Sequence, residues 1–133
     1  MREVVIDTNI LVSALWSRDG NPFRIIEMIF ANELLPHLNS DVIDEYFEVL
    51  SREKLGFTHG RVEKLLDEII KKGIFSSSNT SEAIFVDESD RKFYELAKTN
   101  GASLITGNTK HYPNEAFIVT PKDFLTLYFS NDT

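Results

Sequence analysis

The stretch "VVIDTNILVSAL" at residues 4–15 decides the fold of this chain. Its first part is short and rich in β-branched residues, and its second part repeats apolar residues at helical spacing. This pattern predicts a buried strand over 3–6 that is followed directly by a helix. Such a continuous apolar strand is typical of a parallel sheet. Between strand and helix lies Asp7, a carboxylate that needs hydrogen bonds, a cation or a metal ion if it is buried.

Segments of strand and helix character alternate along the rest of the chain. Apolar runs predict strands at 34–38, 104–105 and 117–119, and one or both of 74–75 and 84–86 fit short strands. Helical spacing predicts helices near 23–30, 41–51, 61–72, 89–100 and 121–128, with a turn at 18–22. Gly101 is expected in the left-handed conformation after a helix, and Thr120 as a helix cap. The alternation predicts an α/β fold with a parallel sheet, which binds ligands at the carboxyl ends of its strands.

The composition limits the classes of function. A chain of 133 residues with 42% apolar residues can fill one core, so we expect a single domain over 1–133. The net charge of −7 gives no global attraction to nucleic acid or to an anionic membrane, so a polyanionic substrate needs a local basic patch or bound metal ions. There is no cysteine and no long apolar segment, and we expect a soluble, cytoplasmic protein without a membrane anchor.

Four polar side chains are placed where they can converge on the ligand-binding edge of the sheet. Asp7 comes directly after the first predicted strand, and Asn108 follows the strand at 104–105. Glu45 borders the apolar arc of the helix near 41–51. Asp90 heads the apolar stripe of the helix near 89–100. Oxygen ligands of this kind suit Mg²⁺ or Mn²⁺ rather than zinc.

Each of the four also has an ordinary structural explanation. Asp7 is well placed to cap the helix that follows it. Glu45 fits a solvated charge on a helix face. Asp90 can complement the helix dipole or form a capping box with Asp87, and Asn108 fits a turn. The residue pattern alone leaves these alternatives open.

Taken together, the motifs resemble a PIN domain over almost the whole chain. The resemblance is carried by "VVIDTNILVSAL", "SDVIDEYFEVL", "DESDRKFYELA", "LITGNTKHYP" and "IVTPKDFL", in that order and spacing. The subgroup to which the chain is most similar comprises the toxin components of toxin–antitoxin systems.

The resemblance implies a three-layer α/β/α sandwich with a central parallel sheet and metal-dependent endoribonuclease chemistry. It makes Asp7 and Asp90 the main ligands of Mg²⁺ or Mn²⁺, Glu45 a further carboxylate ligand and Asn108 the polar group at the fourth position. Many PIN nucleases have Asp at that position, whereas this chain has the neutral Asn108 and therefore only three carboxylates. One firmly held ion, with a second recruited by substrate, is the expectation here. An RNA substrate, an antitoxin protein and a homodimeric partner are implied in the same way.

Further residues have weaker assignments. Thr8, Asn9, Lys110 and His111 are candidates for positioning the substrate. A capping role explains Thr8 equally well, and residues such as His111 and Lys110 are more often a turn residue and a solvated charge. Asp87 and Ser40 are candidates for supporting or capping roles beside the site.

Three other functions compete with the toxin hypothesis. The same residues would serve a housekeeping RNA-processing nuclease. Asn108 in place of an acid, together with the negative charge, would also suit a degenerate PIN domain that only binds RNA or protein. A phosphatase with an aspartyl nucleophile ranks low, because it needs a second Asp where this chain has Asn9.

Overall fold

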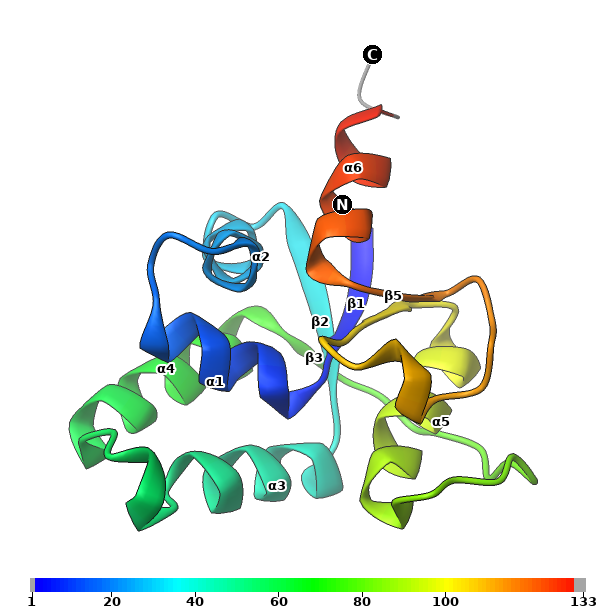
Figure 1. The fold of residues 1–133 in the computed structure, drawn as a ribbon, viewed down its shortest axis with the longest axis horizontal. Coiled ribbons are helices and arrows are strands. Elements are labelled where there is room, and N and C mark those ends of the chain that lie inside the picture. The colour runs from blue at the N-terminus through cyan, green and yellow to red at the C-terminus, as the bar shows by residue number, and fades with distance from the viewer. Residues whose placement is uncertain (1, 131–133) are drawn as a thin grey trace.

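A computed structural model describes residues 2–130 (Figure 1). The opening stretch forms strand β1 (Arg2–Ile6) and helix α1 (Thr8–Trp16), as the sequence predicts. The remaining strands are β2 (Leu34–Leu38), β3 (Ile74–Phe75), β4 (Ser103–Ile105) and β5 (Ile118–Val119). The remaining helices are α2 (Asn21–Phe30), α3 (Ser40–Leu50), α4 (His59–Lys72), α5 (Arg91–Asn100) and α6 (Pro121–Ser130), with 3₁₀ turns η1 (Glu53–Leu55), η2 (Glu88–Asp90) and η3 (Thr109–His111).

The five strands form one parallel sheet in the order β3-β2-β1-β4-β5. From β1 the chain moves to β2 and β3 on one side, and it then returns to β4 and β5 on the other. The connections that follow β1 and β4 therefore diverge at the centre of the sheet. This topological switch point is where doubly wound sheets bind their ligands.

Helices cover both faces of the sheet, which gives three layers (Figure 1). Helix α5 packs on β1, β2 and β4 on one face, whereas α2 and α4 pack on β2 from the other face and α1 packs on α2. Helix α3 contacts α1, α4 and α5, and so it closes the region beyond the carboxyl ends of the strands. The predicted three-layer α/β/α fold with a central parallel sheet is confirmed.

The core explains why these segments form these elements. Val4, Val5 and Ile6 are almost completely buried at the centre of the sheet, and Phe93 from α5 is fully buried as well. Burial on both faces is what the continuous apolar run of β1 requires. The sheet thus holds the residue that follows β1, Asp7, on a rigid support.

Helix boundaries follow local capping chemistry. Asn39 caps α3 by accepting a hydrogen bond from the backbone N–H of Val42, so the expected capping role of Ser40 is wrong, and Ser40 is the exposed first residue of the helix. Gly101 ends α5 at φ 65°, as predicted. Thr120 accepts a hydrogen bond from the backbone N–H of Asp123 and begins α6.

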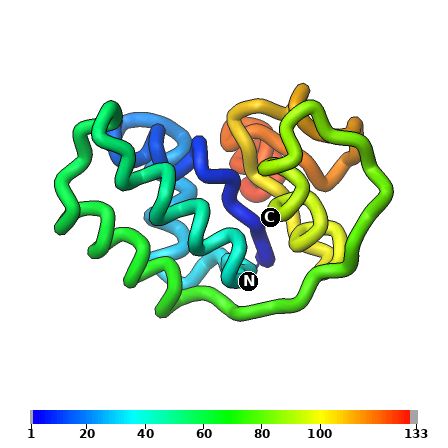
Figure 2. Tube along the Cα trace, turned by 90° about the horizontal axis from the view of Figure 1, so that it is seen from below, coloured from blue at the N-terminus to red at the C-terminus, as the bar shows by residue number. Residues whose placement is uncertain are grey.

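The segment between β3 and η2, residues 76–87, contains no strand. Residues 84–86, which fit a short strand by sequence, have no strand partner, and only Phe85 is buried, between exposed Ile84 and Val86. We call residues 76–86 the strap. Figure 2 shows it running around the outside of the molecule from α4 to α5.

Side chains of α5 hold the strap in place of a neighbouring strand. The guanidinium of Arg91 donates to the backbone oxygens of Ser81 and Ala83, at 2.9 and 2.7 Å. Glu95 accepts a hydrogen bond from the backbone N–H of Ser81, and Thr99 accepts one from that of Asn79. Among the helices of residues 2–130, none is long and apolar enough to cross a membrane.

Candidate active site

Asp7 lies at the carboxyl end of β1 with only 6% of its surface exposed. It occupies the N-cap position of α1 without a well-formed capping hydrogen bond, although the nearby backbone N–H of Asn9 helps to lower its pKa. Its Oδ2 instead accepts hydrogen bonds from Thr106 Oγ and Tyr112 OH, at 2.8 and 2.9 Å. Burial raises the pKa of Asp7, and these two hydrogen bonds oppose that rise.

Thr106 joins the two loops that leave β1 and β4. Its buried hydroxyl donates to Asp7 and accepts from the backbone N–H of Asn108 at 3.0 Å. The side chain of Asn9 accepts a hydrogen bond from the backbone N–H of Gly107 at 3.1 Å. These contacts fix the edges of the switch point relative to each other, and they give Asn9 a positioning role within the protein.

Glu45 reaches the same region from α3. Its Oε2 accepts a hydrogen bond from the hydroxyl of Thr8 at 2.6 Å. The next residue, Tyr46, is buried and donates its hydroxyl to the backbone oxygen of Ile6 at 2.5 Å. The Tyr46 hydrogen bond ties α3 to the end of β1, and Glu45 is therefore not a freely solvated helix charge.

Lys92 forms an ion pair with the other carboxylate oxygen of Glu45. Its ammonium lies 2.6 Å from Glu45 Oε1 and donates to the backbone oxygen of Ser89 at 2.5 Å. The side chains of Lys92 and Glu45 are only 23% and 17% exposed. Both carboxylate oxygens of Glu45 thus have hydrogen-bond partners within the protein.

Asp90 is the least compensated acid of the site. It occupies the N-cap position of α5 without a side-chain capping bond, and its Oδ2 is buried with no hydrogen-bond partner. His111 Nδ1 is the nearest cationic candidate, at 3.8 Å. Burial and the nearby negative charge of Asp7 raise the pKa of Asp90 to about 6. A buried carboxylate oxygen without a partner is costly, and it is the atom that a cation would stabilise.

Asn108 and His111 lie on the loop after β4. The amide nitrogen of Asn108 lies 3.0 Å from Nε2 of His111, and both side chains are exposed. His111 therefore lies between Asn108 and Asp90. Lys110 is also exposed, and no hydrogen bond or ion pair within residues 2–130 joins it to the carboxylates.

Asp87 stands outside this group. It is exposed and caps η2, where Oδ1 accepts hydrogen bonds from the backbone and the hydroxyl of Ser89 at 2.9 and 2.7 Å. These bonds lower the pKa of Asp87. Its negative charge in turn contributes to the raised pKa of Asp90. The capping box with Asp90 considered from the sequence does not form, because the side chain of Asp87 bonds Ser89 instead.

The carboxylates of Asp7, Glu45 and Asp90 influence one another electrostatically, but they are not arranged as a complete metal-binding site. The charge of Glu45 raises the pKa of Asp7, and the charges of Asp7 and Glu45 both raise that of Asp90. Even so, no three His, Asp or Glu side chains in the described part of the chain are close enough to form a metal-binding group. The unpartnered oxygen of Asp90 beside buried Asp7 nevertheless fits one hard divalent cation with oxygen ligands.

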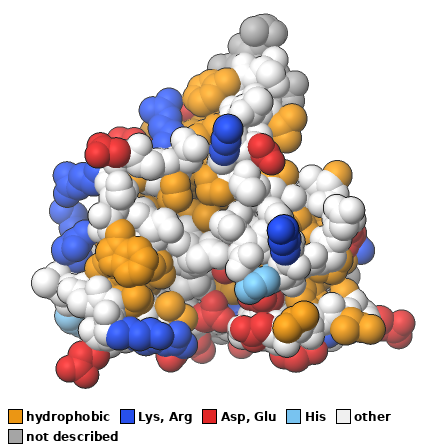
Figure 3. All heavy atoms as spheres, in the orientation of Figure 1, with side chains coloured by type: hydrophobic (Ala, Val, Ile, Leu, Met, Phe, Trp, Pro, Cys, Tyr) orange, Lys and Arg blue, Asp and Glu red, His pale blue; other side chains and the backbone are white. Residues whose placement is uncertain are grey.

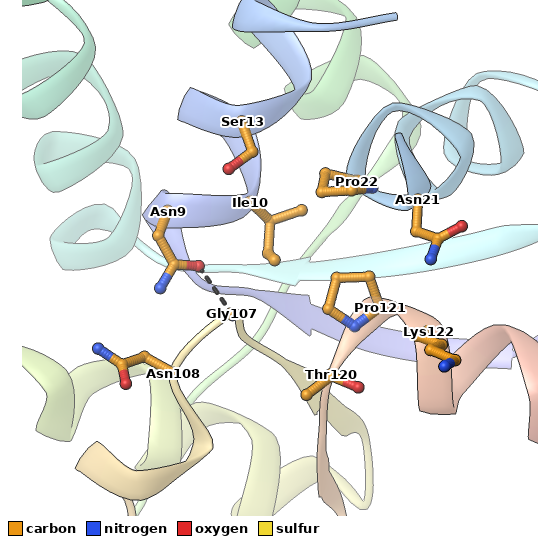
Figure 4. A pocket seen from close by; sticks show the side chains of 10 residues that line it. All are labelled: Asn9, Ile10, Ser13, Asn21, Pro22, Gly107, Asn108, Thr120, Pro121 and Lys122. Atoms are coloured by element: carbon orange, nitrogen blue, oxygen red, sulfur yellow. Dashed lines mark hydrogen bonds between the residues drawn. The ribbon is translucent and has the colours of Figure 1, made fainter. Parts of the chain in front are cut away.

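A hollow of about 470 Å³ opens beside Asn9 and Asn108, and Asp7, Glu45 and Asp90 do not line it (Figure 4). Asn9 and Asn108 stand at one end of it, and Lys122 and Asn21 line it farther along. Ile10, Pro22 and Pro121 supply apolar surface. The hollow thus combines apolar faces with amide and ammonium groups.

Sequence patterns do not single out Lys92 or Tyr112. Lys92 carries an ordinary helix charge, and Tyr112 follows a turn in "TKHYP". Only the packing of α5 and of the loop after β4 against β1 brings their polar atoms to Glu45 and Asp7. The position of Lys92 two residues after Asp90 is no signal either, because side chains two apart on a helix do not face each other.

Comparison with known proteins decides the family. A family model described as a PIN domain matches residues 3–110. This chain belongs to the PIN domain family. PIN domains are generally nucleases.

Two curated relatives match most of this PIN domain chain. An uncharacterised protein from Methanocaldococcus jannaschii is 33% identical over 110 residues, which are 80% of this chain and 70% of the relative. The small ribosomal subunit protein eS1 from Aeropyrum pernix is 28% identical over 109 residues, 80% of this chain and 48% of that protein. The chain therefore spans about half the length of the second relative.

A solved structure shows the same fold. It is the crystal structure of VapBC2 from Rickettsia felis bound to a DNA fragment from their promoter. One of its chains matches with a TM-score of 0.57 and 18% identity, over 88% of this chain and 96% of that chain. At this identity the similarity establishes the PIN architecture alone.

Proposed function

We propose that this PIN domain is an endoribonuclease that depends on Mg²⁺ or Mn²⁺, with residues 1–133 acting as one domain. The observation that carries the proposal is the buried, unpartnered Oδ2 of Asp90, which lies beside Asp7 at the switch point of the sheet. A divalent ion bound there supplies an activated water and neutralises charge on the phosphate. The family supports nuclease chemistry in general.

The proposed roles follow from the contacts of each side chain. Asp7 and Asp90 are the main ligands, and Thr106 and Tyr112 orient the carboxylate of Asp7 through its Oδ2. Glu45 is the third carboxylate of the site; Thr8 orients one of its oxygens, and Lys92 pairs with the other. A carboxylate held by several hydrogen bonds keeps its geometry without reorganisation, which favours binding of a cation in one position.

A second group of side chains is proposed to act on the RNA. Asn108 and His111 lie on the exposed side of the carboxylates, where they can donate hydrogen bonds to a phosphate. Asn9 holds the loop at Gly107, and Lys110 remains a weaker candidate on the same loop as His111. The adjoining hollow, which ends near Lys122, is the proposed path of the strand beside the cleaved bond.

Cleavage of a single-stranded RNA in the presence of Mg²⁺ or Mn²⁺, and its loss in EDTA, tests the proposal. We expect Asp7→Asn and Asp90→Asn to reduce the cleavage rate by about 100-fold or more, because each weakens the hold on the cation that would stabilise the negative charge of the transition state. Asp44→Asn, an exposed acid on the same helix as Glu45, is the matched control and should retain activity. Unchanged cleavage by the purified site variants would contradict the assignment.

We propose the toxin component of a toxin–antitoxin module as the biological role, on the resemblance of the sequence motifs. An antitoxin protein, a homodimeric state and a cytoplasmic location belong to the same proposal. Expression of this protein should arrest growth, and co-expression of a protein encoded by a neighbouring gene should relieve the arrest. Growth arrest that persists in Asp90→Asn would separate toxicity from the nuclease site.

The similarity to a small ribosomal subunit protein favours one alternative, an RNA-processing nuclease. A processing enzyme would cleave one precursor at defined positions, and its expression would leave growth unaffected. Sequencing of RNA ends after expression distinguishes the two roles. A degenerate domain that only binds is favoured by the ion pair between Lys92 and Glu45, and it predicts RNA binding without cleavage in any divalent ion.

A further inference from the structure

Lys92 stands in a cation-binding environment at the edge of the carboxylate site. Its ammonium contacts a carboxylate oxygen of Glu45 at 2.6 Å and the backbone oxygen of Ser89 at 2.5 Å. It also lies 5.4 Å from the centre of the Phe93 ring. A carboxylate oxygen, a carbonyl oxygen and an aromatic face are all groups that stabilise positive charge. Because the side chain is only 23% exposed, the protein holds this cation in a defined place.

This ion pair removes Glu45 from the set of free ligands. Oε1 of Glu45 is taken by Lys92, and Oε2 accepts the hydroxyl of Thr8. The buried oxygen of Asp90, by contrast, has no hydrogen-bond partner, and the basic group near it is the exposed imidazole of His111 at 3.8 Å. The site is therefore divided into one place without a permanent cation, at Asp90, and one place that already has one, at Glu45.

The charges of the site agree with this division. Asp7, Glu45 and Asp90 carry −3 when ionised, whereas one divalent ion and Lys92 together carry +2 + 1 = +3. A second divalent ion in addition to Lys92 would leave an excess of +2 before substrate binds. At the fourth position Asn108 is a neutral amide, so it adds no charge that would offset this excess.

We propose that the Lys92 ammonium takes the place of a second metal ion, so that this chain binds a single divalent ion. Lys92 is thus a built-in cation that compensates Glu45 and presents positive charge beside the metal ion, where an RNA phosphate binds. The inference rests on the proposed function, because it assumes that the carboxylates hold a divalent ion.

Counting bound Mn²⁺ by electron paramagnetic resonance and calorimetry tests the proposal without any measurement of activity. The wild-type protein should bind one Mn²⁺, and Lys92→Met should bind a second, because Glu45 then loses its cation. Lys92→Arg keeps the positive charge and should bind one. Lys98→Met is the matched control, since Lys98 lies on the same helix and pairs with Glu115 at 3.1 Å, away from Asp7.

Each outcome bears on the proposal. Two Mn²⁺ ions on the wild-type protein, or one on both wild type and Lys92→Met, would overturn the role of Lys92 and leave the nuclease proposal intact. No Mn²⁺ on the wild-type protein would overturn both. If Lys92→Met fails to fold by circular dichroism, Lys92→Gln, which keeps a hydrogen-bond donor but no charge, replaces it and should also bind a second Mn²⁺.

Discussion

At the scale of single residues, the site contains two acids with different compensation. Asp7 is buried but has hydrogen bonds from Thr106 and Tyr112, whereas the buried oxygen of Asp90 has none. Both pKa values are raised, chiefly by burial. The buried carboxylate of Asp90 therefore lowers the stability of the folded protein but remains free to bind a ligand, which is common at functional sites.

The raised pKa of Asp90 predicts that stability falls as pH rises. Its pKa is about 6 in the folded protein and near 3.8 when unfolded, so the folded state binds more protons between these values. The free energy of unfolding of the metal-free protein should decrease across this window. Asp90→Asn removes the ionisable group and should be more stable than wild type above about pH 7 by on the order of 2 kcal/mol, with little difference near pH 4.

Urea unfolding in EDTA at several pH values measures this effect. Asp44→Asn, at an exposed position, should show no comparable gain. Addition of Mn²⁺ should stabilise the wild-type protein and leave Asp90→Asn nearly unchanged, since binding to the folded state raises its stability. A variant that is less stable than wild type at every pH would argue against the unpartnered carboxylate.

Tyr112→Phe tests the hydrogen bond to Asp7. Loss of the hydroxyl should raise the pKa of Asp7 further, because this bond favours the ionised form. The rising limb of the pH–rate profile should then move to higher pH, and stability should fall by about 1.5–3 kcal/mol. Tyr94→Phe also loses a hydrogen bond to a carboxylate, that of Glu115, and should lose stability without a shift of the profile. If Tyr112→Phe and Tyr94→Phe gave the same pH–rate profile, the role of Tyr112 would be contradicted.

Residue positions near strand ends were predictable, but their partners were not. Asp7 and Asn108 follow strands directly, and Asp90 begins a helix, so local pattern and topology place them at one edge. Lys92 and Tyr112 acquire their contacts from segments 47 and 105 residues distant in the chain. Such contacts depend on side-chain packing that no local pattern encodes.

At the scale of elements, Gly73 fixes the passage from α4 to β3. Its backbone has no unusual φ, and the requirement is space, since a Cβ would lie 2.5 Å from Leu38 Cδ1 and 2.8 Å from the oxygen of Pro36. Gly73→Ala should therefore destabilise the protein by roughly 1–3 kcal/mol in urea unfolding. Gly60→Ala, in the first turn of α4 with open space around it, should instead be neutral or stabilising by up to roughly 1 kcal/mol. Equal effects of the two changes would contradict close packing at Gly73.

The strap shows where sequence pattern misleads at this scale. The apolar residues 84–86 fit a strand, yet they pair with no strand, and Arg91 of α5 binds the backbone just before them, at Ser81 and Ala83. Arg91→Lys should free the strap, because an ammonium cannot reproduce the forked hydrogen bonds of a guanidinium. We expect faster proteolysis and faster hydrogen exchange within residues 77–86, with α1 unaffected. Lys98→Met, on the same helix, should leave the strap as protected as in wild type.

At the scale of the whole molecule, charge opposes the proposed substrate. The chain carries a net charge of −7, and acidic side chains gather along the lower edge of the face in Figure 3, where α3 and the start of α5 lie in Figure 1. Phosphate groups are repelled there unless a divalent ion intervenes. The sequence alone predicts the fold class and the net charge. Where the acidic side chains gather on the surface follows only from the folded structure.

RNA affinity should therefore depend on a divalent ion rather than on the charge of the protein surface. Fluorescence anisotropy with a labelled single-stranded RNA should show binding at least about tenfold weaker in EDTA than in Ca²⁺, a hard cation that takes the same oxygen ligands. Asp90→Asn separates the two explanations, because it changes the net charge from −7 to −6 while removing a proposed ligand. If surface charge governs binding, this variant binds RNA as well as wild type or better in both conditions. If the ion at Asp90 governs binding, the variant binds weakly even in Ca²⁺, while Asp44→Asn, with the same change in charge, retains the affinity of wild type.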